Sequence, residues 1–492
     1  MKKYILAIDL GTTLIKLVLF DRELRIVSEH SRQYNLETEK EFIEFDAESY
    51  WKTIEEGISE LLQKSRIRSG DIASIALSSQ AETLVLLDKD YKPVRKAISW
   101  LDNRSKKECQ QIKNSFDQQQ GYKVTGQPGV ITTWPITKIL WIKNNERKVF
   151  DCTAKFLLLK DYIVYKFTGE FISEYTIYNF SYYFDIISKQ YWDQMLEFAG
   201  LDQEKLPQLV EPGSNIPRLR KQVIDKFDFG PDINLNLGAL DQMAGMIGVG
   251  NITEGIVSET TGTVLAICTL LGKPMFSSAR IPCHYSAIKD KYILLPICES
   301  GGITLEWFKN NFYEGKSYSY IDQQVSRISP GCNDLLFLPY ITGVNAPEYN
   351  DDARGVFYGI TIKHHKHHFA RAILESIAFI LRKNLDFLES ELSLDIKEII
   401  SLGGGANSTV WNQIKSDVLN REINITSNSQ PTALGAAMLA AVDMGWYGSL
   451  ESIADNKIEL EKTFKPKNSE KYTRSYELFI RLYKALEPVF GQ

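Results

Sequence analysis

An aspartate stands just before a turn of small and hydroxyl-bearing residues near the start of the chain. Asp9 precedes Gly11 by two residues, and Thr12, Thr13 and Lys16 follow. Glycine lets the backbone approach a phosphate closely, and threonine hydroxyls and backbone N–H groups donate to its oxygens. A carboxylate belongs beside a phosphate only with a hard cation between them, and Mg²⁺ fits this place. We interpret the pattern as a candidate Mg²⁺–phosphate site, with a plain hairpin turn as the alternative.

A second carboxylate, Asp241, stands between the apolar strand predicted over Ile233–Leu237 and a Gly- and Ala-rich helix start. A carboxylate at the end of a strand is well placed to act as a general base. The alternative is a helix N-cap, and the two roles can coexist in part.

Polar and aromatic residues gather in the segment Ser78–Ser105. They are Gln80, Glu82, Trp100, Asp102 and Arg104. Polar side chains with one aromatic wall suit a polyhydroxylated substrate, whereas each residue taken singly is also compatible with a surface loop.

Three consecutive glycines, Gly403 to Gly405, follow an apolar strand predicted over Glu398–Leu402 and precede a helix. Such a turn exposes backbone amides and leaves room for a flat ring or a phosphate. A tight connection between strand and helix is the alternative reading.

A histidine-rich run, Lys363–His368, spaces three imidazoles as a helical metal site would. No cysteine or carboxylate nearby completes such a site, and the flanking lysines indicate a solvated segment. We therefore predict that this run binds no metal.

These residues need strands and helices to position them. The segments Tyr4–Leu10 and Ile15–Phe20 flank the Gly-Thr-Thr turn as a predicted β-hairpin. A helix is predicted over Ala47–Leu62 and a buried strand over Asp71–Gln80, so an α/β fold is favoured. The segment Gly255–Gly272 repeats the opening order of strand, Gly-Thr turn and strand. This echo suggests two related domains that face a cleft.

Composition narrows the class of protein. The chain has 492 residues, 44% of them hydrophobic, and a formal net charge of -5. This length predicts two or more domains. Without a long basic run, nucleic acid and anionic membranes are not expected partners. We expect a cytoplasmic protein, since no secretory signal pattern appears and the six cysteines are scattered without a CxxC pair.

Taken together, the motifs resemble the FGGY family of carbohydrate kinases over essentially the whole chain. "AIDLGTT" is similar to the family's first phosphate motif, "ETTGTVLAI" to the second, and "GGGANSTVWNQIKSDVLNREI" to the adenosine motif. Thr133–Glu146 and Gly355–Glu375 resemble the two family signatures. The second signature accounts for the histidine run as a variable spacer that enters a helix.

The resemblance implies two ribonuclease-H-like domains of the actin/Hsp70/sugar kinase superfamily with a cleft between them. Residues 1–247 would bind the sugar and residues 248–492 would bind ATP. Asp241 would be the catalytic base and Asp9 would help to hold Mg²⁺. The implied sugar-binding residues are Gln80, Ala81, Glu82, Trp100, Asp241 and Gln242. The implied ATP-binding residues are Gly11, Thr12, Thr13, Lys16, Gly262, Thr263, Gly404, Gly405 and Asn407. A homodimer is a possible assembly by analogy with relatives.

The pocket motif does not identify which sugar is the substrate. Xylulose kinases tend to carry Met-His after the residue equivalent to Gln80, and glycerol kinases carry Arg-Glu-Thr, whereas this chain has Ala81, Glu82 and Thr83. A pentulose such as xylulose is the first expectation. Other ketoses, glycerol, a longer polyol and a sugar acid are the alternatives. A non-metabolic ATPase of the same superfamily, and a degenerate kinase without turnover, are the rival classes.

Overall fold

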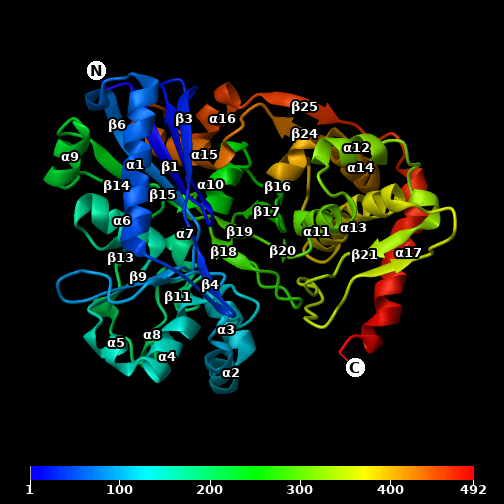
Figure 1. The fold of residues 1–492 in the computed structure, drawn as a ribbon, viewed down its shortest axis with the longest axis horizontal. Coiled ribbons are helices and arrows are strands. Elements are labelled where there is room, and N and C mark those ends of the chain that lie inside the picture. Colours follow the sequence, from blue (N-terminus) through cyan, green and yellow to red (C-terminus); the bar gives the residue numbers. More distant parts are fainter. Residues whose placement is uncertain (1, 492) are drawn as a thin grey trace.

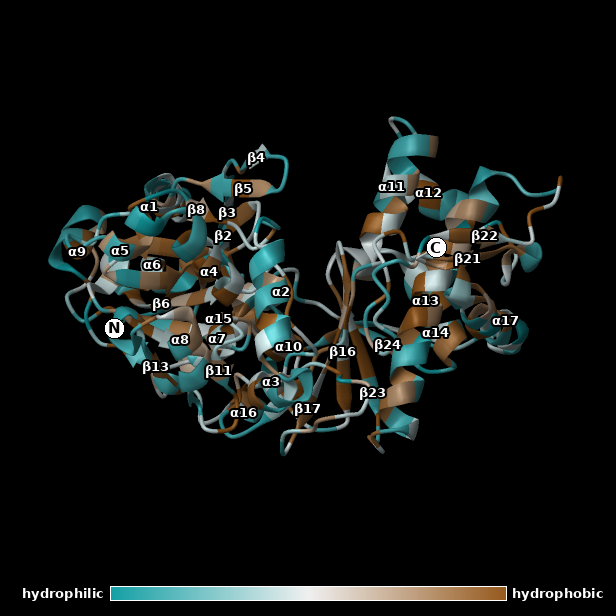
Figure 2. Cartoon of the chain, turned by 90° about the horizontal axis from the view of Figure 1, so that it is seen from below, coloured by the Kyte–Doolittle hydropathy of each residue, from teal (hydrophilic) through white to brown (hydrophobic). Residues whose placement is uncertain are grey.

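The protein consists of two lobes joined side by side, each built on a mixed β-sheet (Figure 1). The structure is a computed structural model that describes residues 2–491. Strands inside each lobe are hydrophobic and many of the helices around them are hydrophilic (Figure 2). Within residues 2–491, no helix combines the length and apolar character that a membrane span requires.

The sheet of the N-terminal lobe starts with the predicted hairpin. Strands β1, β2 and β3 pair in antiparallel fashion, and β6 and β15 extend the sheet parallel to β1. The order across the sheet is β3-β2-β1-β6-β15, with β14 (Asn215–Ile216) at the far edge. The bounds are β1 Tyr4–Leu10, β2 Leu14–Phe20, β3 Ile26–Gln33, β6 Ile72–Ser79 and β15 Asn234–Leu240.

The sheet of the C-terminal lobe repeats this arrangement. Its strands follow the order β19-β17-β16-β23-β24, with three antiparallel strands first and two parallel ones after them. The bounds are β16 Ile256–Thr261, β17 Leu265–Leu271, β19 Tyr292–Leu294, β23 Glu398–Leu402 and β24 Ile423–Thr426. The echo between the two Gly-Thr turns therefore reflects a duplicated fold, as the sequence indicated.

Two small-residue helices pack together where the lobes meet. Helix α10 (Asp241–Gly248) follows β15, and α15 (Pro431–Asp443) follows β24. A Cβ atom on Gly248 would lie 1.9 Å from the Pro431 carbonyl oxygen, and one on Gly435 would lie 1.8 Å from that of Ala244. Only glycine allows this close approach, and α15 thereby packs on the first sheet although it follows the second in sequence.

Several predicted bounds change. The strand expected over Ile233–Leu237 continues to Leu240. After Glu82, strand β7 spans only Leu84–Leu87, because the Asp88 carboxylate accepts hydrogen bonds from the amides of Asp90 and Lys92 and closes a turn. Helix α1 spans Ala47–Ser65.

The histidine run leads into helix α13 (Lys366–Ser390), with His365 as its N-cap. Across residues 2–491, no three His, Cys, Asp or Glu side chains gather as a metal site would.

Candidate active site

Asp9 lies at the end of β1, opposite Lys16 on β2 and beside Ser78 on β6. The Ser78 hydroxyl donates to Asp9 Oδ1 at 3.0 Å. Burial raises the pKa of the Asp9 carboxyl, while Lys16 and the Ser78 hydrogen bond oppose that rise. Asp9 is thus a half-buried carboxylate on which the charge of one lysine, Lys16, acts, and this fits a position for a hard cation.

Two side chains of the predicted sugar pocket donate hydrogen bonds to the turn after Asp9. Gln80 Nε2 donates to the Gly11 carbonyl at 3.1 Å, and Trp100 Nε1 donates to Thr12 Oγ1 at 2.9 Å. The Tyr34 hydroxyl donates to the Thr12 carbonyl. Gln80 and Trp100 therefore link the candidate sugar pocket to the candidate phosphate turn, a contact that their separation in sequence does not reveal.

A bulge near the end of β15 sets the direction of the chain into Asp241. Gly238 has φ +54°, and a Cβ atom there would lie 1.8 Å from the Leu77 carbonyl oxygen. The pairing of β15 with β6 shifts register at this point. Bulges of this kind re-aim the side chains that follow them. The N-cap alternative is wrong, because Leu240 is the N-cap and Asp241 is the first helical residue.

The Asp241 carboxyl lies close enough to Asp9 for the two charges to repel each other. Burial and this repulsion raise the pKa of Asp241 to about 7, while a hydrogen bond from the Gln242 amide, at 2.6 Å, and the charge of Lys160 oppose the rise. Two carboxyls far apart in sequence thus lie near the ends of β1 and β15, the two strands that flank β6 in the sheet. A carboxyl with a pKa near neutrality can accept a proton at physiological pH.

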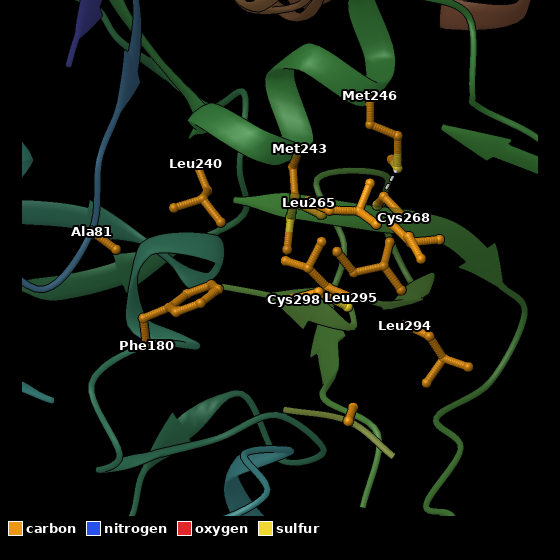
Figure 3. Close-up of a cluster of buried hydrophobic side chains, with 14 of the residues drawn as sticks. Ala81, Phe180, Leu240, Met243, Met246, Leu265, Cys268, Leu294, Leu295 and Cys298 are labelled. Carbon is orange, nitrogen blue, oxygen red and sulfur yellow. Dashed lines mark hydrogen bonds between the residues drawn. The ribbon is translucent and has the colours of Figure 1, made fainter. Parts of the chain in front are cut away.

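Glu82 forms another wall of this region. It has φ +69° and is buried, which raises the pKa of its carboxyl to about 8, with a contribution from Asp241. Lys138 and a 3.4 Å hydrogen bond from the Thr133 hydroxyl oppose the rise. Both residues lie in the first family signature. Ala81 belongs to an apolar cluster with Phe180 and Leu240 (Figure 3).

The second hairpin presents the turn of Gly262 and Thr263 above the start of helix α11 (Gly302–Phe312). The Gly302 amide donates to the Gly262 carbonyl at 2.8 Å, and the Ile303 amide donates to the Thr263 carbonyl at 3.0 Å. A Cβ atom on Gly302 would lie 2.3 Å from the Gly262 oxygen. The sequence reading missed Gly301 and Gly302, although two adjacent glycines before a helix were a usable signal.

The triple-glycine turn rests on this second hairpin. Gly403 has φ +80°, and a Cβ atom on Gly405 would lie 2.7 Å from Thr261 Cβ. Gly404 and Asn407 are exposed. The structure therefore brings the second phosphate motif and the predicted adenosine motif together.

A buried cation lies beneath these two turns, and the sequence reading missed it. Lys415 Nζ, on α14 (Thr409–Leu419), donates to Glu259 Oε1 at 2.6 Å and to Thr261 Oγ1 at 3.0 Å. Lys415 and Glu259 side chains are both wholly buried. The lysine within an otherwise amphipathic helix gave no separate signal of burial.

Helix α10, which begins at Asp241, contacts the second sheet. Its Met243 and Met246 side chains point at residues of β17, and the Cys268 thiol donates to the Met246 sulfur at 3.1 Å (Figure 3). Asp241 therefore begins a helix that also contacts the second sheet.

Comparison with known proteins assigns the family. The N-terminal domain model of the FGGY family of carbohydrate kinases matches residues 4–248, and the C-terminal domain model matches residues 261–444. The chain is 31% identical over 485 residues to a xylulose kinase of Bacillus subtilis, covering 98% of this chain and 97% of the relative.

Two solved structures share the whole fold. The ligand-bound xylulose kinase of Lactobacillus acidophilus is 28% identical with a TM-score of 0.92, and covers 99% of both chains. The gluconate kinase of the same organism is 29% identical with a TM-score of 0.91, again over 99% of both chains.

Proposed function

Because this chain belongs to the FGGY family of carbohydrate kinases and is a sugar phosphotransferase, we propose that it transfers the γ-phosphate of ATP to a hydroxyl of a pentulose such as xylulose. The observation that carries the proposed mechanism is the placement of Asp9 near the end of β1 and of Asp241 directly after β15, on either side of β6. One carboxyl can take the proton of the sugar hydroxyl while the other lies beside the phosphate turn.

In this proposal Asp241 accepts the proton as the hydroxyl oxygen attacks the phosphorus. The turns at Gly11–Thr13 and Gly262–Thr263, with Lys16, donate to the phosphates, and Gly404, Gly405 and Asn407 line the adenosine pocket. Asp9 would hold Mg²⁺, whose chemical contribution is to neutralise charge on the phosphates. Residues 1–247 provide the sugar side, and residues 248–492 provide the nucleotide side.

The charges of the pocket support a neutral sugar. Glu82 and Asp241 are both carboxyls, and Ala81 stands where a glycerol kinase would have arginine. Lys138, whose charge acts on Glu82, donates to the Ser99 carbonyl at 2.9 Å. Ionised Asp241 would repel the negative charge of an aldonate, and no arginine stands at position 81 to bind it, so the pentulose is favoured over a sugar acid. Gluconate is the second candidate, because a gluconate kinase shares the whole fold.

The test is ATP consumption with xylulose, other ketoses, glycerol and gluconate, for the wild type and Asp241→Ala. Loss of the base is expected to lower kcat by about 10²–10⁴-fold. Asp241→Ala turnover close to wild type would remove the base assignment. Turnover with gluconate but none with xylulose would transfer the substrate assignment to the sugar acid.

Two further predictions concern the whole protein. A cytoplasmic location is expected from the sequence, and a homodimer from analogy. Light scattering of the purified chain measures the second directly, since a dimer has twice the 56.2 kDa mass of the chain.

A further inference from the structure

The backbone that carries Asp241 is held by a side chain from another part of the N-terminal lobe. The Leu240 amide donates to Thr176 Oγ1 at 2.8 Å. Leu240 lies just after the bulge at Gly238, where the regular pairing of β15 with β6 is interrupted. Thr176 belongs to the short helix α7 (Tyr175–Tyr178) and is wholly buried.

The Thr176 hydroxyl is itself oriented by a buried carboxylate. It lies 2.8 Å and 2.7 Å from the two oxygens of Glu174, and the Thr176 amide donates to Glu174 Oε2 at 2.6 Å. A hydroxyl has one proton and two lone pairs. Because its proton points at Glu174, a lone pair is left to accept the Leu240 amide.

The carboxylate is in turn fixed by a buried lysine. Lys160 Nζ, on α6 (Leu159–Thr168), donates to Glu174 Oε1 at 2.7 Å, and both side chains have no exposed surface. A wholly buried ion pair is costly to desolvate and is weak evidence for stability alone. This pair lies two hydrogen bonds from the residue before Asp241, which gives it a use in positioning.

We propose that Lys160, Glu174 and Thr176 form a buried chain of positioning residues that fixes the backbone at Leu240 and thereby the direction of the Asp241 carboxyl. The proposal rests on the proposed role of Asp241 as the base. None of the three side chains contacts substrate in this scheme. Glu174 and Thr176 act through Leu240, and Lys160 also acts on the Asp241 carboxyl through its charge. Loss of these residues should therefore lower the rate of the chemical step more than it weakens binding of either substrate.

The test compares Thr176→Val with Thr176→Ser. Valine keeps the shape of threonine without the hydroxyl, and serine keeps the hydroxyl without the methyl group. We expect Thr176→Val to lower kcat by about 10–100-fold, with the KM for ATP and sugar changed by about twofold or less, since small misplacement of a reacting group is costly. Thr176→Ser should stay within about threefold of the wild-type kcat. Equal kcat for the two variants, or a raised sugar KM with unchanged kcat in Thr176→Val, would overturn the proposal.

Hydrogen exchange at the Leu240 amide separates this proposal from the proposed function. The amide should exchange faster in Thr176→Val than in Thr176→Ser and the wild type, whatever the sugar specificity. If the Leu240 amide stays as protected in Thr176→Val as in the wild type, the proposed positioning role of these residues is wrong. If the amide exchanges faster in Thr176→Val but the wild type shows no sugar-dependent ATP turnover, the proposed function is wrong. Lys160, Glu174 and Thr176 would then hold the backbone without a catalytic role.

Discussion

Each of the two Gly-Thr hairpins carries a carboxylate near the end of its first strand. Asp9 on β1 lies opposite Ser78 on the neighbouring parallel strand, and Glu259 on β16 lies opposite Ser401. In each case the serine hydroxyl donates to the carboxylate. Each lobe thus pairs an acid near the turn with a serine on the adjacent parallel strand.

The hairpins differ in what compensates the charge. Across the antiparallel pair, Asp9 faces Lys16, whereas Glu259 faces Ile267. Helix α14 supplies Lys415 to Glu259, and the pair is sealed from solvent. Asp9 keeps a half-exposed position near Asp241. An acid near the turn is therefore an open carboxylate in one lobe and part of a closed ion pair in the other.

The largest expected effect comes from opening the closed pair. Lys415→Met leaves Glu259 buried and unpaired, which should lower the free energy of unfolding by about 3–5 kcal/mol. Lys16→Met is the matched change in the first hairpin, and the partly exposed lysine there should cost about 1 kcal/mol or less. Urea unfolding of both variants measures the difference. Equal losses would mean that the two hairpins are not distinguished by charge burial.

A double variant checks the cause of that loss. Lys415→Met combined with Glu259→Leu removes both charges, and such a replacement is often neutral or stabilising. We expect it to recover most of the stability lost in Lys415→Met. A double variant as unstable as the single one would point to packing by the lysine stem instead.

The next effect is on turnover and belongs to the open carboxylate. Asp9→Asn keeps an acceptor for Ser78 but removes the charge, and should lower kcat with Mg·ATP by about 10²–10³-fold. Glu259→Gln is the control, since its kcat per folded molecule should change far less. If Asp9→Asn instead weakens sugar binding, the carboxylate serves the sugar and our reading of this hairpin is wrong.

The pH dependence gives a smaller effect. Asp241 must be ionised to accept a proton, and its pKa is raised to about 7, so kcat/KM for the sugar should fall about tenfold per pH unit below that value and level off above it. Asp9→Asn removes the repelling charge and should shift the midpoint to lower pH, whereas Glu259→Gln should leave it in place. A flat profile from about pH 5.5 to pH 8 would exclude Asp241 as the titrating base.

The smallest effect tests the link between the sugar side and the first turn. Trp100→Phe keeps an aromatic wall but removes the donor to Thr12 Oγ1, a hydrogen bond whose net contribution is about 0.5–1.5 kcal/mol. We expect a rise of about two- to tenfold in the KM for ATP. A change in the sugar KM alone would assign the indole N–H to the sugar.

Local pattern was sufficient for the elements that carry the motifs. The hairpin around Gly11 and the strand before Gly403 were predictable because apolar alternation and glycine turns are short-range signals. The end of β15 was placed three residues early, since a bulge at Gly238 depends on contact with Leu77 on another strand. The relation between Gln80 and Gly11 was likewise invisible, because it is made across strands.

The partners of charged residues within apolar segments were the feature of the structure that was hardest to predict from the sequence. "FLLLKDYIV" places Lys160 and Asp161 inside an apolar run, which was a usable sign that these charges are buried and paired. The partner, Glu174, could not be chosen from the sequence, because burial and pairing are decided by packing between elements.

The sequence by itself determined the family, the two duplicated halves and the types of residue in the site, because each depends on motifs contiguous along the chain. Tertiary structure alone decided which carboxylates meet and which are neutralised. Asp9 and Asp241 come together because parallel strands end at one edge of a sheet, and Glu259 differs from Asp9 because a helix delivers Lys415 to it. Charge compensation is a property of neighbours in space, and no local pattern specifies it.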